Sequence, residues 1–183
     1  MTQARLCSPR IDLVPLGGDH LEFEVLLESD PDVRRYLGNG NPLSRAEIEA
    51  GHQHRITAAD GTAGIGYWVG VVAGECVGRW VMRAPDRPDQ GPSIGQAELG
   101  FQLLPRYWGQ GLASEGVREL VRHGFEDLGL KRIFSETMTV NTAARATLAC
   151  VGMEYIRVYH PRWKHPISGT EHGEVEYAIT RDY

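Results

Sequence analysis

Residues 97–128 constrain the fold most strongly, because a strand-like run, a glycine-containing turn and a helix-like run follow one another there. The run 97–104 alternates and is rich in Leu and Phe, which predicts a strand. Over 113–128 the apolar residues recur on one side of a helix. Gly109 and Gly111 lie in the turn, where the first N–H groups of the helix have no partner inside it. The stretch therefore predicts an anion site at a strand-to-helix turn.

Two widespread phosphate-binding patterns fit this turn poorly. The P-loop requires a Gly-Lys-Ser/Thr sequence, which does not follow here. The Rossmann dinucleotide pattern is met at Gly109, Gly111 and Ala113, but its acidic residue about 20 positions later is missing around 131–134. A nucleotide-binding oxidoreductase is therefore the weaker alternative. Glycines that only shape the turn are a second alternative.

Several features of this region occur together: a strand with Glu98 and Gly100, the loop pattern Arg106-x-x-Gly109-x-Gly111, a second strand, and Asn141 after it. In these residues the chain resembles the GNAT superfamily of acetyl-CoA-dependent N-acetyltransferases, whose pyrophosphate loop reads Gln/Arg-x-x-Gly-x-Gly/Ala. The run PRYWGQGLASE is similar to the subgroup that includes the RimJ and RimL enzymes. The resemblance implies a single α/β domain over 1–183 with the GNAT fold. In that fold a mixed, mostly antiparallel central sheet is flanked by helices, and a splayed strand pair holds acetyl-CoA.

The composition limits the partners that we expect. With 183 residues and 42% hydrophobic residues, the chain suits one domain with a sizeable core. The net charge is −5 and no block of Lys and Arg stands out, so we expect no nucleic-acid partner and favour a cationic small molecule or peptide. No signal-peptide pattern and no apolar stretch of about 18 residues occurs, so we expect a cytoplasmic protein without a membrane partner.

Cysteine and histidine spacing predicts no metal site. The three cysteines show no CxxC pattern, and we expect them to behave as small buried apolar groups; they are Cys7, Cys76 and Cys150. Three histidines gather near the loop 161–173, but their spacing matches no ligand motif; they are His160, His165 and His172.

The rest of the chain predicts further strands and helices. Strands are expected at 10–15, 67–73, 76–82, 131–140, 153–160 and 174–180. Helices are expected after Asp19, after Asp30, after Ser44 with its capping partner Glu47, and after Asn141. Two stretches rich in Gly or Pro predict loops, at 60–66 and 84–96. The hairpins supply antiparallel pairs and the strand–helix–strand unit supplies a parallel one.

The resemblance implies where acetyl-CoA binds. In the GNAT family the motif strand splays from its neighbour, and free backbone N–H groups there contact pantetheine and the thioester carbonyl. By this resemblance the Leu103 N–H is the oxyanion donor, Arg106 adds charge, and Asn141 resembles an Asn that contacts CoA. The implied pyrophosphate loop consists of Gly109, Gln110, Gly111, Leu112 and Ala113. A purely solvated Arg106 and a purely capping Asn141 are the alternatives.

An amine must lose its proton before it attacks the thioester. Neutralisation at pH 7 costs about 1 kcal/mol for an α-amine and about 5 kcal/mol for a lysine, so a base helps a lysine far more. Glu136 shares a strand face with Phe134 and Met138, which predicts an apolar setting. It lies five residues before Asn141, as the catalytic Glu does in RimI-like relatives. Glu98 is the second candidate base, and either carboxylate could instead pair with an Arg or bind the acceptor ammonium.

The family pattern identifies no acid in this chain that would protonate the departing thiolate. Relatives place a Tyr seven residues or a Ser three residues after the Asn, where this chain has Leu148 and Ala144. Water, Tyr159 or no acid are the options that remain.

We therefore predict an N-acetyltransferase that moves an acetyl group from acetyl-CoA to a primary amine by direct attack in a ternary complex. The acceptor is a protein N-terminal α-amine or a small-molecule amine. A CoA-binding sensor or scaffold with the same fold and little turnover is the alternative. Because dimers are common among such relatives, a homodimer is compatible with this prediction.

Overall fold

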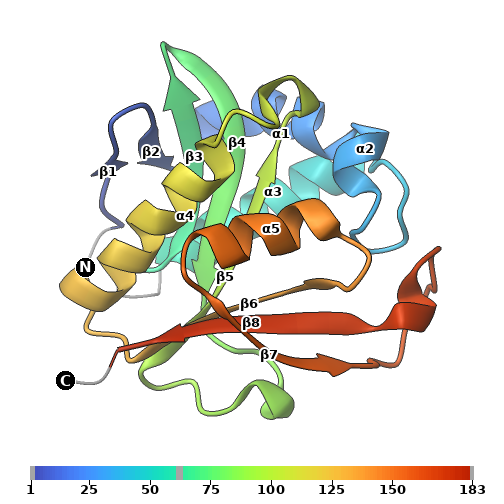
Figure 1. Ribbon diagram of the computed structural model, residues 1–183. Coiled ribbons are helices and arrows are strands. Elements are labelled where there is room, and N and C mark those ends of the chain that lie inside the picture. The colour runs from blue at the N-terminus through green and yellow to red at the C-terminus, as the bar shows by residue number, and fades with distance from the viewer. Residues whose placement is uncertain (1–2, 61–63, 182–183) are drawn as a thin grey trace.

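The computed structural model describes residues 3–60 and 64–181, which form one eight-stranded sheet with helices on both faces (Figure 1). The strands lie in the order β1-β2-β3-β4-β5-β6-β8-β7, and only β5 and β6 are parallel. The predicted α/β fold with a mixed, mostly antiparallel sheet is therefore confirmed. The strands are β1 (Leu6–Cys7), β2 (Asp12–Pro15), β3 (Gly66–Val72), β4 (Glu75–Arg83), β5 (Gln96–Leu103), β6 (Arg132–Met138), β7 (Glu154–Tyr159) and β8 (Glu174–Thr180).

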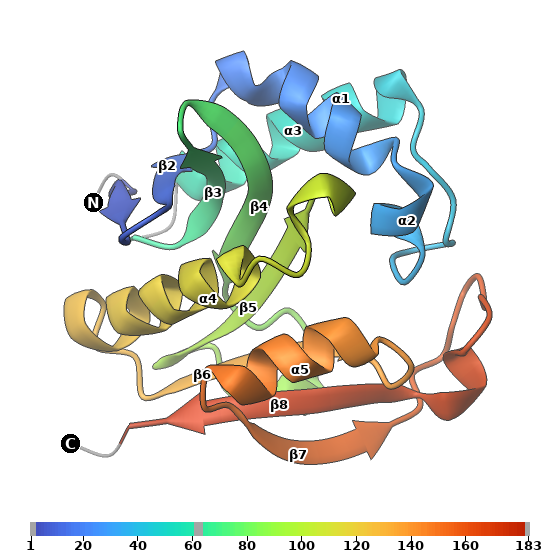
Figure 2. The same ribbon diagram turned by 45° about the horizontal axis from the view of Figure 1, so that its top comes forward.

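β5 and β6 pair only over their first residues. The register runs from Gln96 opposite Arg132 to Glu98 opposite Phe134 and then stops, although both strands continue. Figure 2 shows the two strands diverging beyond this point. The predicted splayed strand pair is therefore present, and it begins directly after Glu98.

The helices cover the two faces of the sheet. Helices α4 (Leu112–Arg122) and α5 (Thr142–Cys150) lie in front of it in Figure 1, and α1 (Leu21–Glu28) and α3 (Arg45–Asp60) lie behind it. The short α2 (Pro31–Arg34) follows α1. On the α4 side the core includes Trp68, Trp80, Leu99 and Leu120, and on the α1 side a smaller core includes Phe23, Leu27 and Val69. Each such buried side chain contributes about 1.5–3 kcal/mol of burial free energy.

Three of the predicted helix caps are present. Asp30 accepts hydrogen bonds from the N–H groups two and three residues later, at 2.9 and 3.2 Å. The Ser44 N–H donates to the Glu47 carboxylate at 2.8 Å, and Asn141 accepts from the N–H three residues later at 3.2 Å. The expected cap at Asp19 is wrong, because Asp19 lies inside a one-turn 3-10 helix and α1 begins only after that turn.

Other differences come from features too short or too local for a sequence pattern. Strand β1 has only two residues and is not predicted, and α4 gives way to a π-helical turn at His123–Asp127. Cys7 and Cys150 are exposed, so their expected burial is wrong; the first lies on the edge strand β1 and the second is the last residue of α5. Part of the predicted 60–66 loop lies outside the described residues. In the described part of the chain, no helix is long and apolar enough to span a bilayer.

Candidate active site

The turn between β5 and α4 presents backbone N–H groups at its surface. Gly109 and Gly111 have φ values of +71° and +76°, which favour glycine. Gly111 is the N-cap of α4 and has no side chain to accept from the first N–H groups of the helix. The N–H groups of Leu112 and Ala113 therefore have no partner within the helix, and Gln110 lies in the same exposed turn. The five predicted loop residues gather at one helix N-terminus, as an anion site requires.

Arg106 stands at the start of this turn and is exposed. Its guanidinium lies over the ring of Tyr107, 4.9 Å from the centroid. Within 3–60 and 64–181 no carboxylate forms an ion pair with Arg106. The Tyr107 hydroxyl raises the pKa of Arg106, and Glu75, which accepts a hydrogen bond from that hydroxyl, raises it further electrostatically without forming an ion pair. The guanidinium therefore keeps donors that an anionic ligand can use.

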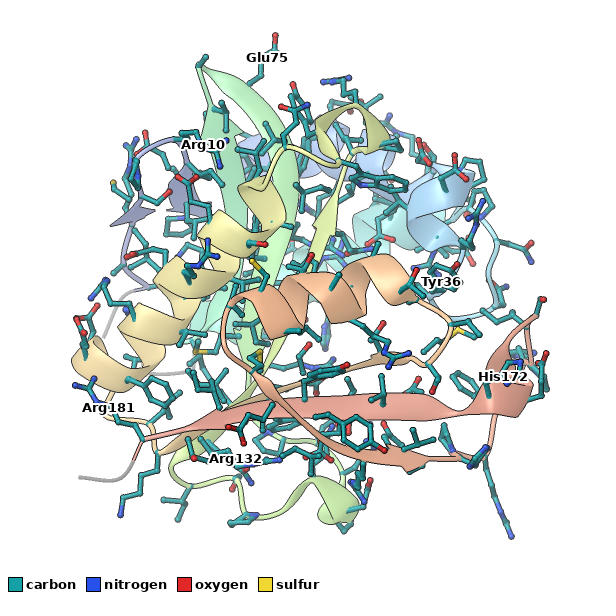
Figure 3. All side chains as sticks on the ribbon, in the orientation of Figure 1. Arg10, Tyr36, Glu75, Arg132, His172 and Arg181 are labelled. Atoms are coloured by element: carbon teal, nitrogen blue, oxygen red, sulfur yellow. The ribbon has the colours of Figure 1, made fainter. Side chains whose placement is uncertain are left out.

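A second arginine fastens the turn to the start of the chain, and sequence reasoning missed it. Arg10 donates from Nε to the Glu115 carboxylate at 2.6 Å and from Nη1 to the Gln110 carbonyl at 3.0 Å. Ser8 donates to the same carboxylate at 2.7 Å. Burial by itself raises the pKa of Glu115. These hydrogen bonds lower the pKa by a larger amount, so it lies below its ordinary value. Figure 3 shows Arg10 beside the hairpin of β3 and β4, far in sequence from the turn that it holds.

The end of β5 exposes backbone groups to the gap between β5 and β6. The Leu104 N–H donates to the Val77 carbonyl at 3.0 Å, so these two residues form a hydrogen-bonded pair of the β4–β5 ladder. Because such pairs alternate, the N–H groups of Leu103 and Phe101 point away from β4. The Trp108 indole N–H donates to the Leu103 carbonyl at 2.8 Å and fixes this strand end. The predicted oxyanion donor therefore faces the gap.

The two candidate bases lie close together under a loop. Gln90 donates to Glu136 at 3.1 Å and to Glu98 at 3.2 Å. Arg87 donates to both oxygens of Glu136 at 2.8 Å, and Arg83 donates to Glu98 at 2.9 and 3.1 Å. The expected apolar setting of Glu136 is wrong, because the 84–96 loop folds over the sheet and places polar side chains on this carboxylate.

The positions of the two glutamates relative to the splay differ. Glu98 is the last residue of β5 that pairs with β6, whereas Glu136 lies two residues beyond its paired neighbour Phe134. The side chains are 12% and 5% exposed, respectively. Glu136 therefore lies beside the opened part of the strand pair, and Glu98 lies beside the closed part.

A tyrosine and a third glutamate extend this network. Arg87 donates to the Tyr159 hydroxyl at 3.1 Å, and that hydroxyl donates to Glu174 at 2.7 Å. Burial raises the pKa of Tyr159, and the negative charges of Glu174 and Glu136 raise it further. Burial also raises the pKa of Glu174, against the opposing effect of the Tyr159 hydrogen bond. Sequence reasoning did not find Glu174, since no motif links it to the splay.

Neither α5 position at which relatives place an acid carries one here. Leu148 is fully buried in the core and Ala144 carries no proton donor. Asn141 caps α5 and donates from Nδ2 to the Thr137 hydroxyl at 3.1 Å, so its side chain has a structural role. Within the part of the chain that the structure describes, no group of three or more His, Cys, Asp or Glu is arranged to hold a metal ion.

An open cavity of about 760 Å³ lies between the α2 region and the loop before β8. Tyr36 and His172 line it from these two segments and lie on the same side of the molecule in Figure 3. Asp32, Arg35 and Glu171 add charged groups of both signs. Its volume lies within the range of roughly 300–1,000 Å³ that small-molecule sites occupy.

Comparison with known proteins identifies the class. A family model described as an acetyltransferase (GNAT) domain matches residues 10–154. A protein of Aspergillus fumigatus named FsC-acetyl coenzyme A-N(2)-transacetylase is 40% identical over 183 aligned residues, which cover 98% of this chain and 77% of that protein. The chain therefore belongs to the GNAT acetyltransferase family. It is an acetyl-CoA-dependent N-acetyltransferase, as the sequence motifs predict.

Solved structures agree on the fold. A GNAT-family acetyltransferase from Bacillus anthracis has a TM-score of 0.78 at 18% identity and covers 97% of this chain and 98% of its own. RimL, a ribosomal L7/L12 alpha-N-protein acetyltransferase in complex with coenzyme A, has a TM-score of 0.77 at 16% identity, with 94% of this chain and 95% of its own covered. At these identities the likeness concerns the fold.

Proposed function

We propose that this N-acetyltransferase acts on an α-amine, in a small molecule or at a peptide amino terminus, as one domain over 1–183 of the subgroup that includes RimJ and RimL. The observation that carries this proposal is the pairing of each candidate base with an arginine, Glu136 with Arg87 and Glu98 with Arg83. In each pair the guanidinium occupies carboxylate oxygens that would otherwise be open to an acceptor. An α-amine needs only about 1 kcal/mol to lose its proton at pH 7, whereas a lysine needs about 5 kcal/mol, so an α-amine depends less on these carboxylates.

Acetyl-CoA lies in the gap between β5 and β6 in this proposal. Its pyrophosphate accepts hydrogen bonds from the N–H groups of the turn 109–113, and Arg106 supplies a positive charge. The thioester carbonyl accepts from the Leu103 N–H, and loss of one such donor typically costs about 3 kcal/mol of transition-state stabilisation. Asn141 lies at the far end of β6 from the paired segment and contacts the cofactor there.

Glu136 orients the acceptor ammonium and takes its proton, since it lies beside the opened part of the strand pair. The neutral amine then attacks the thioester carbon and forms the C–N bond. As the C–S bond breaks, the nitrogen loses its second proton to water and the sulfur leaves as the thiolate. Tyr159 is a poor acid for the departing sulfur, because its pKa is raised and its proton faces Glu174. We propose that the thiolate leaves without a protein acid, which a thiol pKa of about 8.5 permits.

The name of the Aspergillus fumigatus relative supports this acceptor class, because it specifies transfer to a nitrogen designated N(2). A numbered nitrogen implies an acceptor with more than one nitrogen, which favours a molecule larger than a simple alkylamine.

Two isomeric lysine derivatives test the proposal. One has a free α-amine and a blocked side chain, and the other has a blocked α-amine and a free side chain. Thiol release from acetyl-CoA at pH 7 is expected to show a kcat/KM at least tenfold higher for the free α-amine, since the deprotonation costs differ by about 4 kcal/mol. Equal rates, or a preference for the side-chain amine, would contradict the proposed acceptor.

A further inference from the structure

Gln102 lies on β5 directly before Leu103, on the sheet face that carries α1 and α3. Its side-chain oxygen accepts a hydrogen bond from Arg79, the residue opposite it on β4. A guanidinium has donors only, so the carboxamide oxygen must face Arg79 and the NH₂ group must face away. The hydrogen bond from Arg79 therefore determines which end of the Gln102 amide faces β4.

Arg79 itself cannot turn, because it belongs to a buried charge cluster formed by Glu24, Glu28, Arg34, Arg55 and Arg79. It donates to Glu24 and Glu28 of α1, which are 0% and 3% exposed. Arg55 donates to the first glutamate at 2.7 Å and Arg34 to the second at 3.1 Å. The cluster therefore holds the Gln102 oxygen in one place.

The Gln102 NH₂ group points away from β4, toward the side on which β5 separates from β6. Among the described residues it donates to no acceptor, and its nitrogen is not sealed inside the protein. Glu136, which the proposed function assigns to the acceptor ammonium, lies across the splay, two residues beyond the last paired position of β6. Two N–H donors that no described residue accepts therefore lie one residue before Leu103, the proposed oxyanion donor, and across the splay from Glu136.

We infer that Gln102 is a specificity-determining residue whose NH₂ group binds the carbonyl oxygen next to the acceptor amine. The acceptor class is then the α-amino acyl compounds, in which the ammonium nitrogen and the carbonyl carbon are bonded to the same carbon. The inference rests on the proposed function and narrows it. An amine without this carbonyl leaves the Gln102 donors unpaired when it displaces water, and such a mismatch lowers kcat/KM.

A matched pair of acceptors tests the inference: a dipeptide amide, and its alkene isostere, in which a carbon–carbon double bond replaces the first amide and so removes its carbonyl oxygen and its N–H. Because the two amines differ in basicity, kcat/KM is referred to the concentration of neutral amine. The wild-type enzyme is expected to prefer the dipeptide amide by about tenfold or more in kcat/KM, as a hydrogen-bonded site rejects an analogue without the group. Gln102→Glu still accepts from Arg79 but has no donor, and Gln102→Met has neither. Both variants are expected to lose most of this preference.

Controls separate this loss from general damage. The charge cluster contains three arginines and two glutamates, so it tolerates the added carboxylate of Gln102→Glu. Thermal unfolding with acetyl-CoA confirms that each variant folds. Gln53→Glu adds the same charge on an exposed position of α3 and is expected to keep the wild-type preference.

The outcomes distinguish the two proposals. Equal wild-type rates for the two acceptors, or a preference that both Gln102 variants retain, overturn the inference while the observed turnover leaves the proposed function in place. An enzyme that binds acetyl-CoA but acetylates neither these compounds nor the free α-amine of the lysine derivative overturns both.

Discussion

Replacement of Arg79 by leucine is expected to lower the free energy of unfolding by about 3–5 kcal/mol, the cost of breaking a buried ion pair. Arg79 is 8% exposed and donates to Glu24 and Glu28, so its removal leaves two carboxylates in the interior with too few partners. Urea denaturation followed by circular dichroism measures this change. Arg5→Leu is the control, because Arg5 pairs with Asp12 at 2.7 Å on the surface and its loss is expected to have little effect.

The same cluster predicts an acid-dependent loss of stability. Burial by itself raises the pKa of Glu24. Arg79 and Arg55 lower the pKa by a larger amount, so the folded-state pKa lies below the ordinary 4.5. Glu24 therefore contributes its full stabilisation above that pH and loses it as the pH falls toward the lower folded-state value. Arg79→Leu is expected to flatten this part of the pH profile. A stability loss no larger than that of Arg5→Leu would contradict the assigned role of the cluster.

Glu136→Gln is expected to lower turnover about five- to tenfold at pH 7, since the base spares the α-amine acceptor a deprotonation cost of only about 1 kcal/mol at that pH. The loss is expected to be largest at low pH and to shrink as the pH rises, because the acceptor amine then loses its proton without help. Steady-state rates with a free α-amine acceptor between pH 6 and pH 9 measure this profile. The KM for acetyl-CoA is expected to stay near its wild-type value.

Glu98→Gln is the matched control, because Glu98 is also bound by an arginine and by Gln90 but lies beside the closed part of the strand pair. It is expected to reduce turnover less than Glu136→Gln does. A wild-type pH profile for Glu136→Gln would assign the proton transfer to Glu98 or to solvent instead.

The sequence predicted correctly those features that depend only on residues close together in the chain. The glycines of the 109–111 turn, the caps at Asp30 and Asn141, and the alternating strands all follow from neighbouring residues, and the structure confirms them. The splay follows from the family resemblance and is visible in the register of β5 and β6. The proposed cofactor site rests on these features.

The surroundings of the candidate bases could not be predicted in this way. The 84–96 loop has the composition of a solvated connection, yet Arg87 and Gln90 fold from it onto carboxylates of two strands. Arg10 likewise meets Glu115 across more than half of the chain length. Contacts of this kind depend on how the sheet brings distant segments together, and no spacing in the sequence records them.

The Gln102 amide illustrates the same limit. Its alternation with Glu98 on β5 follows from the strand pattern, but its orientation depends on Arg79 and on two glutamates of α1. The sequence predicts on which face of the sheet Gln102 lies. The direction of its hydrogen-bond donors depends on the folded charge cluster.

We propose that the turn from Arg106 to Ala113 holds the pyrophosphate of acetyl-CoA. The most direct test is the dissociation constant of acetyl-CoA, measured by calorimetry for the wild type and for Arg106→Glu. Lys131→Glu is the control, because Lys131 is exposed near the opposite end of α4 and changes the net charge equally. We expect Arg106→Glu to weaken binding more than tenfold, as the loss of a charge-assisted hydrogen bond of about 1.5–3 kcal/mol requires, and Lys131→Glu to leave binding unchanged. Equal affinities for all three proteins would contradict the claim.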